Sequence, residues 1–76
     1  MIYRVLAHWD AEANVWSAES VDVKGLVAEA DTLDDLARDL RTIVPELLEL
    51  NHGIDRIREE TQIVIMADRT ETLLPA

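Results

Sequence analysis

The stretch VDVKGLVAEADTLDDL, residues 21–36, contains the junction that decides the fold. Gly25 can adopt a positive φ that other residues resist, so a short strand is expected just after it, over residues 26–30. A helix is then expected to begin at Asp31 or Thr32, because Thr32 has an acidic residue three positions later, as in a capping box. Acid in the first helical turn also suits the positive end of the helix dipole. The stretch therefore predicts a strand that passes directly into a helix.

Beyond this junction, apolar residues recur every three or four positions. This spacing is typical of a long helix whose apolar stripe packs on a sheet. The stripe continues in phase through Pro45, which predicts a kink, or a stop and restart, at that position. Asn51, His52 and Gly53 are expected to end the helix. The stripe consists of Leu33, Leu36, Ala37, Leu40, Ile43, Val44, Leu47 and Leu48.

Three further segments have the β-branched, aliphatic and aromatic residues of strands: residues 2–9, 15–20 and 62–69. Residues 10–14 are expected to form a tight hairpin turn between the first two. The last of the three is apolar on both sides, which predicts a central strand or one buried at a subunit contact. Residues 54–60 are expected to form a turn or a short helical piece, and the end of the chain, through Ala76, a frayed tail.

The predicted order is β-β-β-α-β, in a single domain over residues 1–76 of the α+β class. We expect an antiparallel sheet, with the long helix packed on one face. The first two strands pair through the hairpin, and the third could lie beside either. The residues expected to face the helix from the first two strands are Tyr3, Val5, Ala7, Trp9, Trp16 and Ala18.

One helix can cover only one face of this sheet, so the other face is expected to stay open. It combines apolar residues with charges, a pattern typical of a dimer or partner surface. Its glutamates, Glu19 and Glu29, are expected to pair with Arg4 or Lys24. The apolar residues expected on this face are Ile2, Leu6, Val27 and Val64.

The composition favours some partners over others. With 16 acidic and 7 basic residues among 76, the formal net charge is −9. This charge repels phosphate backbones, so we expect no direct nucleic-acid binding and favour a basic protein partner; the charge could also serve solubility alone. The sequence has no cysteine, no signal-like opening and no run long enough to span a membrane, so a cytoplasmic protein is expected. Because a domain this small has a marginal core, we also expect a homodimer.

The segment from Asp22 to Leu36 resembles the corresponding segment of the HicB-like antitoxins, in which a strand, a glycine and a second strand lead into a capped helix. Ala30 stands where that pattern usually has glycine, and Asp31 and Thr32 follow as the pattern requires. The stretch VPELLEL, followed by NHG, looks most like a short, stand-alone bacterial branch of that group of unknown function. The resemblance covers essentially the whole chain. It implies a partial RNase-H-like fold without the nuclease centre.

The resemblance also implies a function. Full HicB antitoxins bind and occlude HicA, a small basic toxin that cleaves RNA, and many carry a separate DNA-binding domain. No such extension is expected here after the fourth strand. We therefore expect a non-catalytic protein-binding module that binds a small basic, HicA-like partner through an acidic surface. The candidate partner-binding residues are Asp22, Glu29, Asp35, Asp39, Glu46 and Glu49.

Two alternatives remain open from the sequence. One is a stand-alone homodimer that has no toxin partner. The other is a metal-dependent hydrolase that uses His8, Asp10 and Glu12. Its mark would be measurable metal binding that is lost in His8→Ala and Asp10→Ala. Ligands at these spacings are common by chance, so no metal and no other cofactor is expected. No nucleophile context and no glycine-rich phosphate loop is evident, so we do not expect an enzyme.

Overall fold

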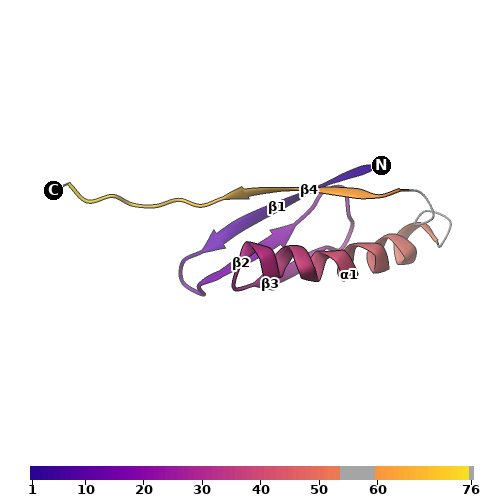
Figure 1. Cartoon of the computed structure of the whole chain (residues 1–76), viewed down its shortest axis with the longest axis horizontal. Helices are drawn as coiled ribbons and strands as arrows, with labels where there is room; N and C mark the ends of the chain where they lie inside the picture. Colours follow the sequence, from indigo (N-terminus) through magenta and orange to yellow (C-terminus); the bar gives the residue numbers. More distant parts are fainter. Residues whose placement is uncertain (54–59, 76) are drawn as a thin grey trace.

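The computed structural model is described for residues 1–53 and 60–75. The turn expected over residues 54–60 lies outside the described residues except for Glu60, and Ala76 also lies outside them. The elements follow the predicted β-β-β-α-β order (Figure 1), so the α+β class is confirmed. They are β1 (Ile2–Asp10), β2 (Val15–Glu19), β3 (Val27–Ala30), α1 (Leu33–His52) and β4 (Gln62–Asp68).

The four strands form one sheet in the order β3-β2-β1-β4. The first three strands are antiparallel, with Ala18 of β2 opposite Ala7 of β1 and Ala28 of β3. β4 pairs parallel with β1, from Ile2 opposite Gln62 onward. The sheet is therefore mixed and not wholly antiparallel. The chain crosses from β3 through α1 to the far edge, and a helical crossover returns a strand in the direction of the one it left.

The position of β4 also differs from one expectation. β4 is the outermost strand beside β1, so its prediction as a central strand is wrong. The helix does not bury this edge, because α1 packs mainly over β3 and β2. The alternative interpretation, that β4 is covered at a subunit contact, stays a prediction.

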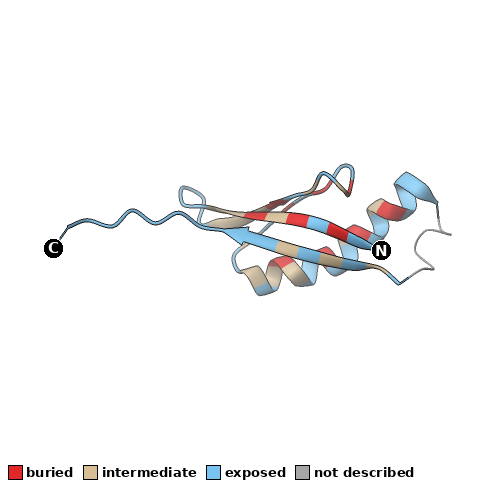
Figure 2. Ribbon diagram, turned by 90° about the horizontal axis from the view of Figure 1, so that it is seen from above, coloured by how far each residue is buried: buried red, intermediate tan, exposed pale blue. Residues whose placement is uncertain are grey.

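The core lies between α1 and the sheet face predicted to meet it. Burial alternates along β1, where Tyr3, Val5 and Ala7 are buried and the residues between them are more exposed (Figure 2). Trp9 and Trp16 are half-buried at the rim, with their ring centroids 5.5 Å apart. The helix buries the centre of its predicted stripe: Leu36, Leu40, Val44 and Leu48.

The helix begins and ends at the residues that the sequence predicts. The Thr32 hydroxyl accepts a hydrogen bond from the Asp35 backbone N–H at 3.0 Å, as an N-cap does. At the other end, Gly53 has a φ of 85° and donates its N–H to the Glu49 carbonyl at 2.8 Å. The helix is continuous through Pro45, so the predicted stop and restart is wrong. Pro45 has no N–H to donate to the carbonyl of Arg41, and both residues are exposed.

Beyond β4, residues 69–75 run away from the body in extended form (Figure 1). Leu73 and Leu74 are 88% and 87% exposed, and the tail contributes to overall dimensions of 56 × 19 × 18 Å. Arg69, the first residue of the tail, is held against β1, because its guanidinium lies 4.3 Å from the centre of the Trp9 ring. Within residues 1–53 and 60–75, no helix has the length and apolar character that crossing a bilayer requires.

Candidate functional site

Four of the candidate acidic residues lie on one side of α1. Asp35, Asp39, Glu46 and Glu49 follow one another at helical spacing, with Thr42 filling the step between the second and third. We call these four residues the acidic helix face. Asp39, Glu46 and Glu49 are exposed, and Asp35 is half-buried. The spacing therefore places four carboxylates along the side of the helix that does not contact the sheet.

These carboxylates differ in their partners. Asp35 lies 3.4 Å from the Arg38 guanidinium and is partly neutralised by it. In the described parts of the chain, no ion pair or side-chain hydrogen bond involves Asp39, Glu46 or Glu49. Uncompensated carboxylates on one helix face repel one another and attract cations.

An exposed apolar side chain accompanies the last two carboxylates. Glu46, Glu49 and Leu50 border an open surface hollow of about 560 Å³. Leu50 is 81% exposed, although leucine is a residue that usually packs inside. Two carboxylates beside an exposed aliphatic side chain suit a lysine or arginine, because those side chains combine an apolar stem with a cationic head.

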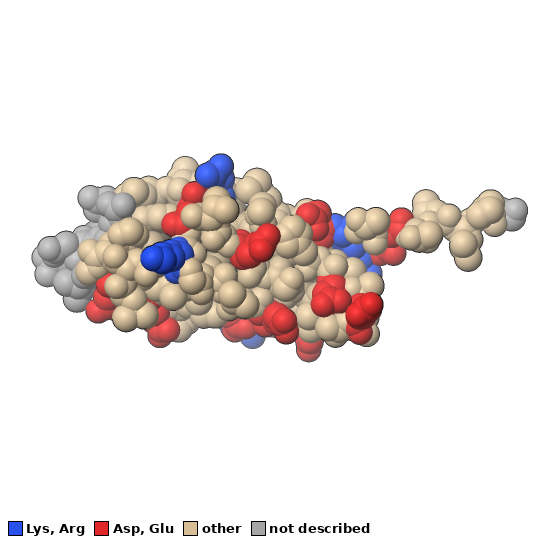
Figure 3. Space-filling model, turned by 180° about the vertical axis from the view of Figure 1, so that it is seen from behind, with Lys and Arg blue, Asp and Glu red and all other residues tan. Residues whose placement is uncertain are grey.

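The other two candidates lie elsewhere. Asp22 belongs to the link that follows β2, and Glu29 is exposed on β3, opposite Ser17 of β2. Seen from behind, the acidic side chains form several separate groups with uncharged surface between them (Figure 3). The structure thus brings four of the six candidate residues onto one face and leaves two apart.

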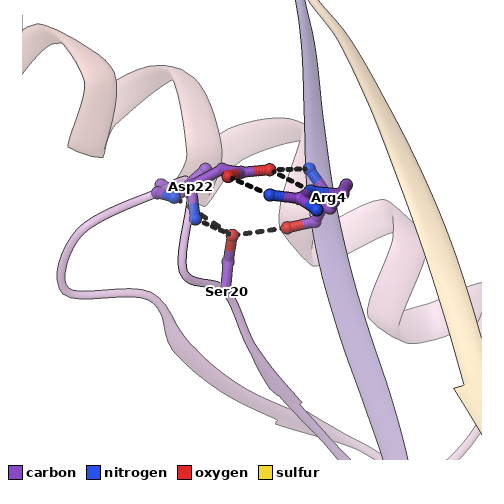
Figure 4. A network of polar contacts seen from close by, with 4 residues as sticks. Arg4, Ser20 and Asp22 are labelled. Atoms are coloured by element: carbon purple, nitrogen blue, oxygen red, sulfur yellow. Dashed lines mark hydrogen bonds and ion pairs between the residues drawn. The ribbon is translucent and has the colours of Figure 1, made fainter.

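Asp22 is engaged within the chain (Figure 4). Its carboxylate accepts hydrogen bonds from the Arg4 guanidinium at 2.9 and 3.0 Å, and from the Arg4 backbone N–H at 2.8 Å. The side-chain hydrogen bonds from Arg4 lower the pKa of Asp22 to about 2. The Ser20 hydroxyl donates to the Arg4 carbonyl and accepts from the backbone N–H groups of Asp22 and Val23.

This network has a structural cause. β2 ends at Glu19, so the backbone of Arg4 on β1 has no strand residue to pair with in the register of the hairpin. The side chains of Asp22 and Ser20 supply the missing acceptor and donor in place of a strand. The same bonds fix the link that buries Val23 completely. Arg4 therefore pairs with Asp22, and its predicted pairing with a glutamate of the open face is wrong.

The Arg4–Ser20–Asp22 network was missed from the sequence. The local signal was a serine two residues before an aspartate, a pattern that favours side-chain bonds to nearby backbone N–H groups. The long-range part had no such signal, because Arg4 lies 18 residues from Asp22 in the chain.

His8 forms a second polar group on the open sheet face. Its Nδ1 lies 2.9 Å from both carboxylate oxygens of Asp68 on β4, and its Nε2 lies 3.2 Å from Oε1 of Glu19 on β2. Hydrogen bonds with Asp68, and then with Glu19, raise the pKa of His8. The predicted pairing of Glu19 with Arg4 or Lys24 is therefore wrong, because Glu19 contacts His8.

The residues considered for a metal site do not share one centre. His8 contacts the two carboxylates of neighbouring strands, whereas Asp10 accepts hydrogen bonds from the backbone N–H groups of Glu12 and Ala13 at 3.0 and 3.2 Å. Asp10 thereby closes the predicted hairpin turn, in which Asn14 has a φ of 56°. In the described ranges, no three His, Cys, Asp or Glu side chains are arranged to hold a metal ion.

Comparisons with known proteins give a family and one solved structure. A profile of the family described as "Domain of unknown function (DUF1902)" matches residues 2–74. The crystal structure of a hypothetical protein from the extremely thermophilic bacterium Thermus thermophilus is similar to this chain, with 42% sequence identity and a TM-score of 0.72; the match covers 97% of this chain and 99% of that one. No curated protein shows significant sequence similarity to the chain. Neither match names a HicB-like protein, so that grouping stays a prediction.

Proposed function

This chain belongs to the family described as a domain of unknown function (DUF1902), and we propose that it is a non-catalytic protein-binding module that docks a small basic protein on the acidic helix face. The observation that carries the proposal is the set of three exposed carboxylates, Asp39, Glu46 and Glu49, that have no ion-pair partner among the described residues. A cationic partner would relieve their mutual repulsion, and the net charge of −9 would steer it to this chain.

Each residue of the acidic helix face has a role in this proposal. Glu46 and Glu49 accept hydrogen bonds from lysine or arginine head groups, while Leu50 contacts the apolar stems of those side chains. Asp39 extends the negative field along the helix. Asp35 contributes less, because Arg38 already neutralises part of its charge.

The two remaining candidates have different places in the proposal. Asp22 does not contact the partner in this proposal, because its carboxylate is bonded to Arg4; it contributes by holding the fold. Glu29 adds negative charge on a separate side of the sheet and acts only on the long-range approach of the partner.

The resemblance to HicB-like antitoxins supports a partner of the HicA kind, a small basic toxin that this chain would occlude. The β-β-β-α-β order agrees with the fold that the resemblance implies. The excess of 16 acidic over 7 basic residues agrees with a basic partner. A gene for a short basic protein beside the gene for this chain would add support.

Capture from the source lysate tests the proposal. The triple variant Asp39→Asn/Glu46→Gln/Glu49→Gln removes three charges from the acidic helix face. The matched control Glu12→Gln/Asp31→Asn/Glu60→Gln removes three charges from exposed positions outside it. We expect one small basic protein on the wild-type and control columns, with about a tenfold loss of affinity for the triple variant, since each exposed ion pair is worth about 0.2–1 kcal/mol. Equal capture by all three columns would contradict the proposal.

A further inference from the structure

The free edge of β4 lacks the usual protections of an exposed strand. β4 is a seven-residue strand at the end of the sheet, and its outer edge has no strand beside it among the described residues. Edge strands in monomers are typically short or carry inward charges, proline or a bulge that prevents pairing with another chain. Residues 61–67, TQIVIMA, contain none of these charges and are the longest uncharged run in the chain.

Both faces of β4 also expose apolar surface. On the open sheet face, Val64 and Met66 are 41% and 44% exposed. On the helix side, Ile63 and Ile65 pack against the core but are only half-buried. The strand thus offers apolar contacts above and below a row of backbone hydrogen-bonding groups, which is the combination that strand addition needs.

We propose that β4 pairs antiparallel with β4 of a second copy of this chain, about a two-fold axis at Ile65, so that the two four-stranded sheets become continuous. The strand is self-complementary, because residues 61–67 carry no charge that would oppose itself in a second copy, and this favours a second copy as the occupant of the edge. With a net charge of −9, two copies repel over most of their surface, and residues 61–67 are where they can approach without opposing acids. A closed two-fold pairing also leaves no free β4 edge for further growth.

The register follows from the charges at the strand ends. An axis at Ile65 places Val64 opposite Met66 of the second copy and Gln62 opposite Asp68 of the second copy. Moving the axis to Val64 would set Glu60 against Asp68, two acids. Moving it to Met66 would set Asp68 against the apolar Val64. The axis at Ile65 is the register that avoids both conflicts.

The tail adds contact area to this pairing. A stable interface usually buries about 800 Å² per partner, more than one strand edge provides. In the proposed register, Arg69 of each copy lies beside Thr61 of the other, and Thr61 lines an apolar hollow of about 200 Å³ with Ile63 and Pro45. Beyond Arg69 the tail carries the exposed Leu73 and Leu74, which are apolar side chains free to join the interface.

The proposal goes beyond the proposed function and is independent of it, because the acidic helix face is not part of this interface. Sedimentation equilibrium of the wild type is expected to give twice the chain mass of 8.6 kDa. The double variant Val64→Lys/Met66→Lys is expected to sediment as a monomer, because it sets like charges against each other across the axis. Asp39→Lys on α1 is the control and should remain dimeric. Circular dichroism shows whether each variant keeps its fold.

A crosslinking experiment tests the register without charged substitutions. The chain has no cysteine, so single cysteines can be introduced at Ile65→Cys, Gln62→Cys and Asp39→Cys and treated with a short bismaleimide. We expect covalent dimers mainly from Ile65→Cys, at least tenfold faster than from the other two. A monomeric wild type, a dimer that survives the double lysine variant, or equal crosslinking at all three positions would overturn the proposal.

Discussion

Asp22 shows how one carboxylate can take the place of a strand. Its oxygens accept hydrogen bonds from both the backbone and the side chain of Arg4, where β2 has already ended. A side chain can close a sheet in this way because a carboxylate has several lone-pair sites for N–H donors. The main role of Asp22 is therefore to stabilise the fold, whereas the sequence suggests it as a partner-binding residue.

The pKa of Asp22 predicts how stability depends on pH. Its pKa in the folded chain is about 2, below the ordinary value of about 3.9 that holds in the unfolded chain. The stabilisation is therefore complete above about pH 4 and is lost as the pH falls through about 2. Urea unfolding of the wild type and Asp22→Asn between pH 2 and 6 measures this effect. We expect the wild type to be more stable at pH 6, and the difference to shrink toward pH 2. A difference that does not change with pH would contradict this role.

His8 predicts a dependence of the opposite sign. Contacts with Asp68 and Glu19 raise its pKa in the folded chain, so its contribution is complete below the ordinary value of about 6.5 and is lost as the pH rises through the raised value. His8→Gln should therefore lose stability relative to the wild type at pH 5.5 and approach it at high pH. Asp68→Asn is the matched control, since it should weaken the same pH dependence without removing the histidine. A His8→Gln difference that grows toward high pH would exclude this role.

The helix and the first three strands were predictable because their signals are local. Alternating apolar residues define β1, and a three- and four-residue repeat defines α1. Thr32 and Gly53 mark the helix ends through cap chemistry that involves residues within four positions. Four of the six candidate acidic residues were placed together for the same reason, since helical spacing alone sets which residues share a face.

The position and direction of β4 were not predictable from such signals. Apolar residues on both sides of a strand fit a central position and also a covered edge, so the pattern of residues 62–68 did not decide between them. The parallel pairing with β1 depends on where α1 returns the chain, which is a property of the tertiary structure. The Arg4–Ser20–Asp22 network could not be predicted for a related reason, because its residues meet only after β1 and β2 have paired.

The N-cap of α1 gives a prediction for the helix as an element. Thr32→Ala removes the hydroxyl that accepts from the Asp35 N–H, and loss of such a cap costs about 1 kcal/mol of stability. Thr42→Ala is the matched control, because Thr42 is an exposed residue within the helix, where alanine is favoured by a few tenths of a kcal/mol. Thermal unfolding of both variants measures the contrast. Equal melting temperatures for the two would show that Thr32 does not cap the helix.

The proposed surfaces lie on different parts of the molecule. The acidic helix face is on the side of α1 away from the sheet, and β4 is at the sheet edge beside β1. A dimer formed through β4 would leave both acidic helix faces free, so each chain could bind one basic partner. Partner binding and self-association can therefore be disturbed separately, by variants of α1 and of β4.

We propose that the acidic helix face docks a basic protein, and the rate at which the captured partner associates with this chain measures that contact. Stopped-flow measurements from low to moderate salt should show a rate that falls steeply with ionic strength for the wild type and the Glu12→Gln/Asp31→Asn/Glu60→Gln control. The variant Asp39→Asn/Glu46→Gln/Glu49→Gln should associate more slowly and with a weaker salt dependence. If the variant keeps both the rate and the salt dependence of the control, the acidic helix face is not the docking surface.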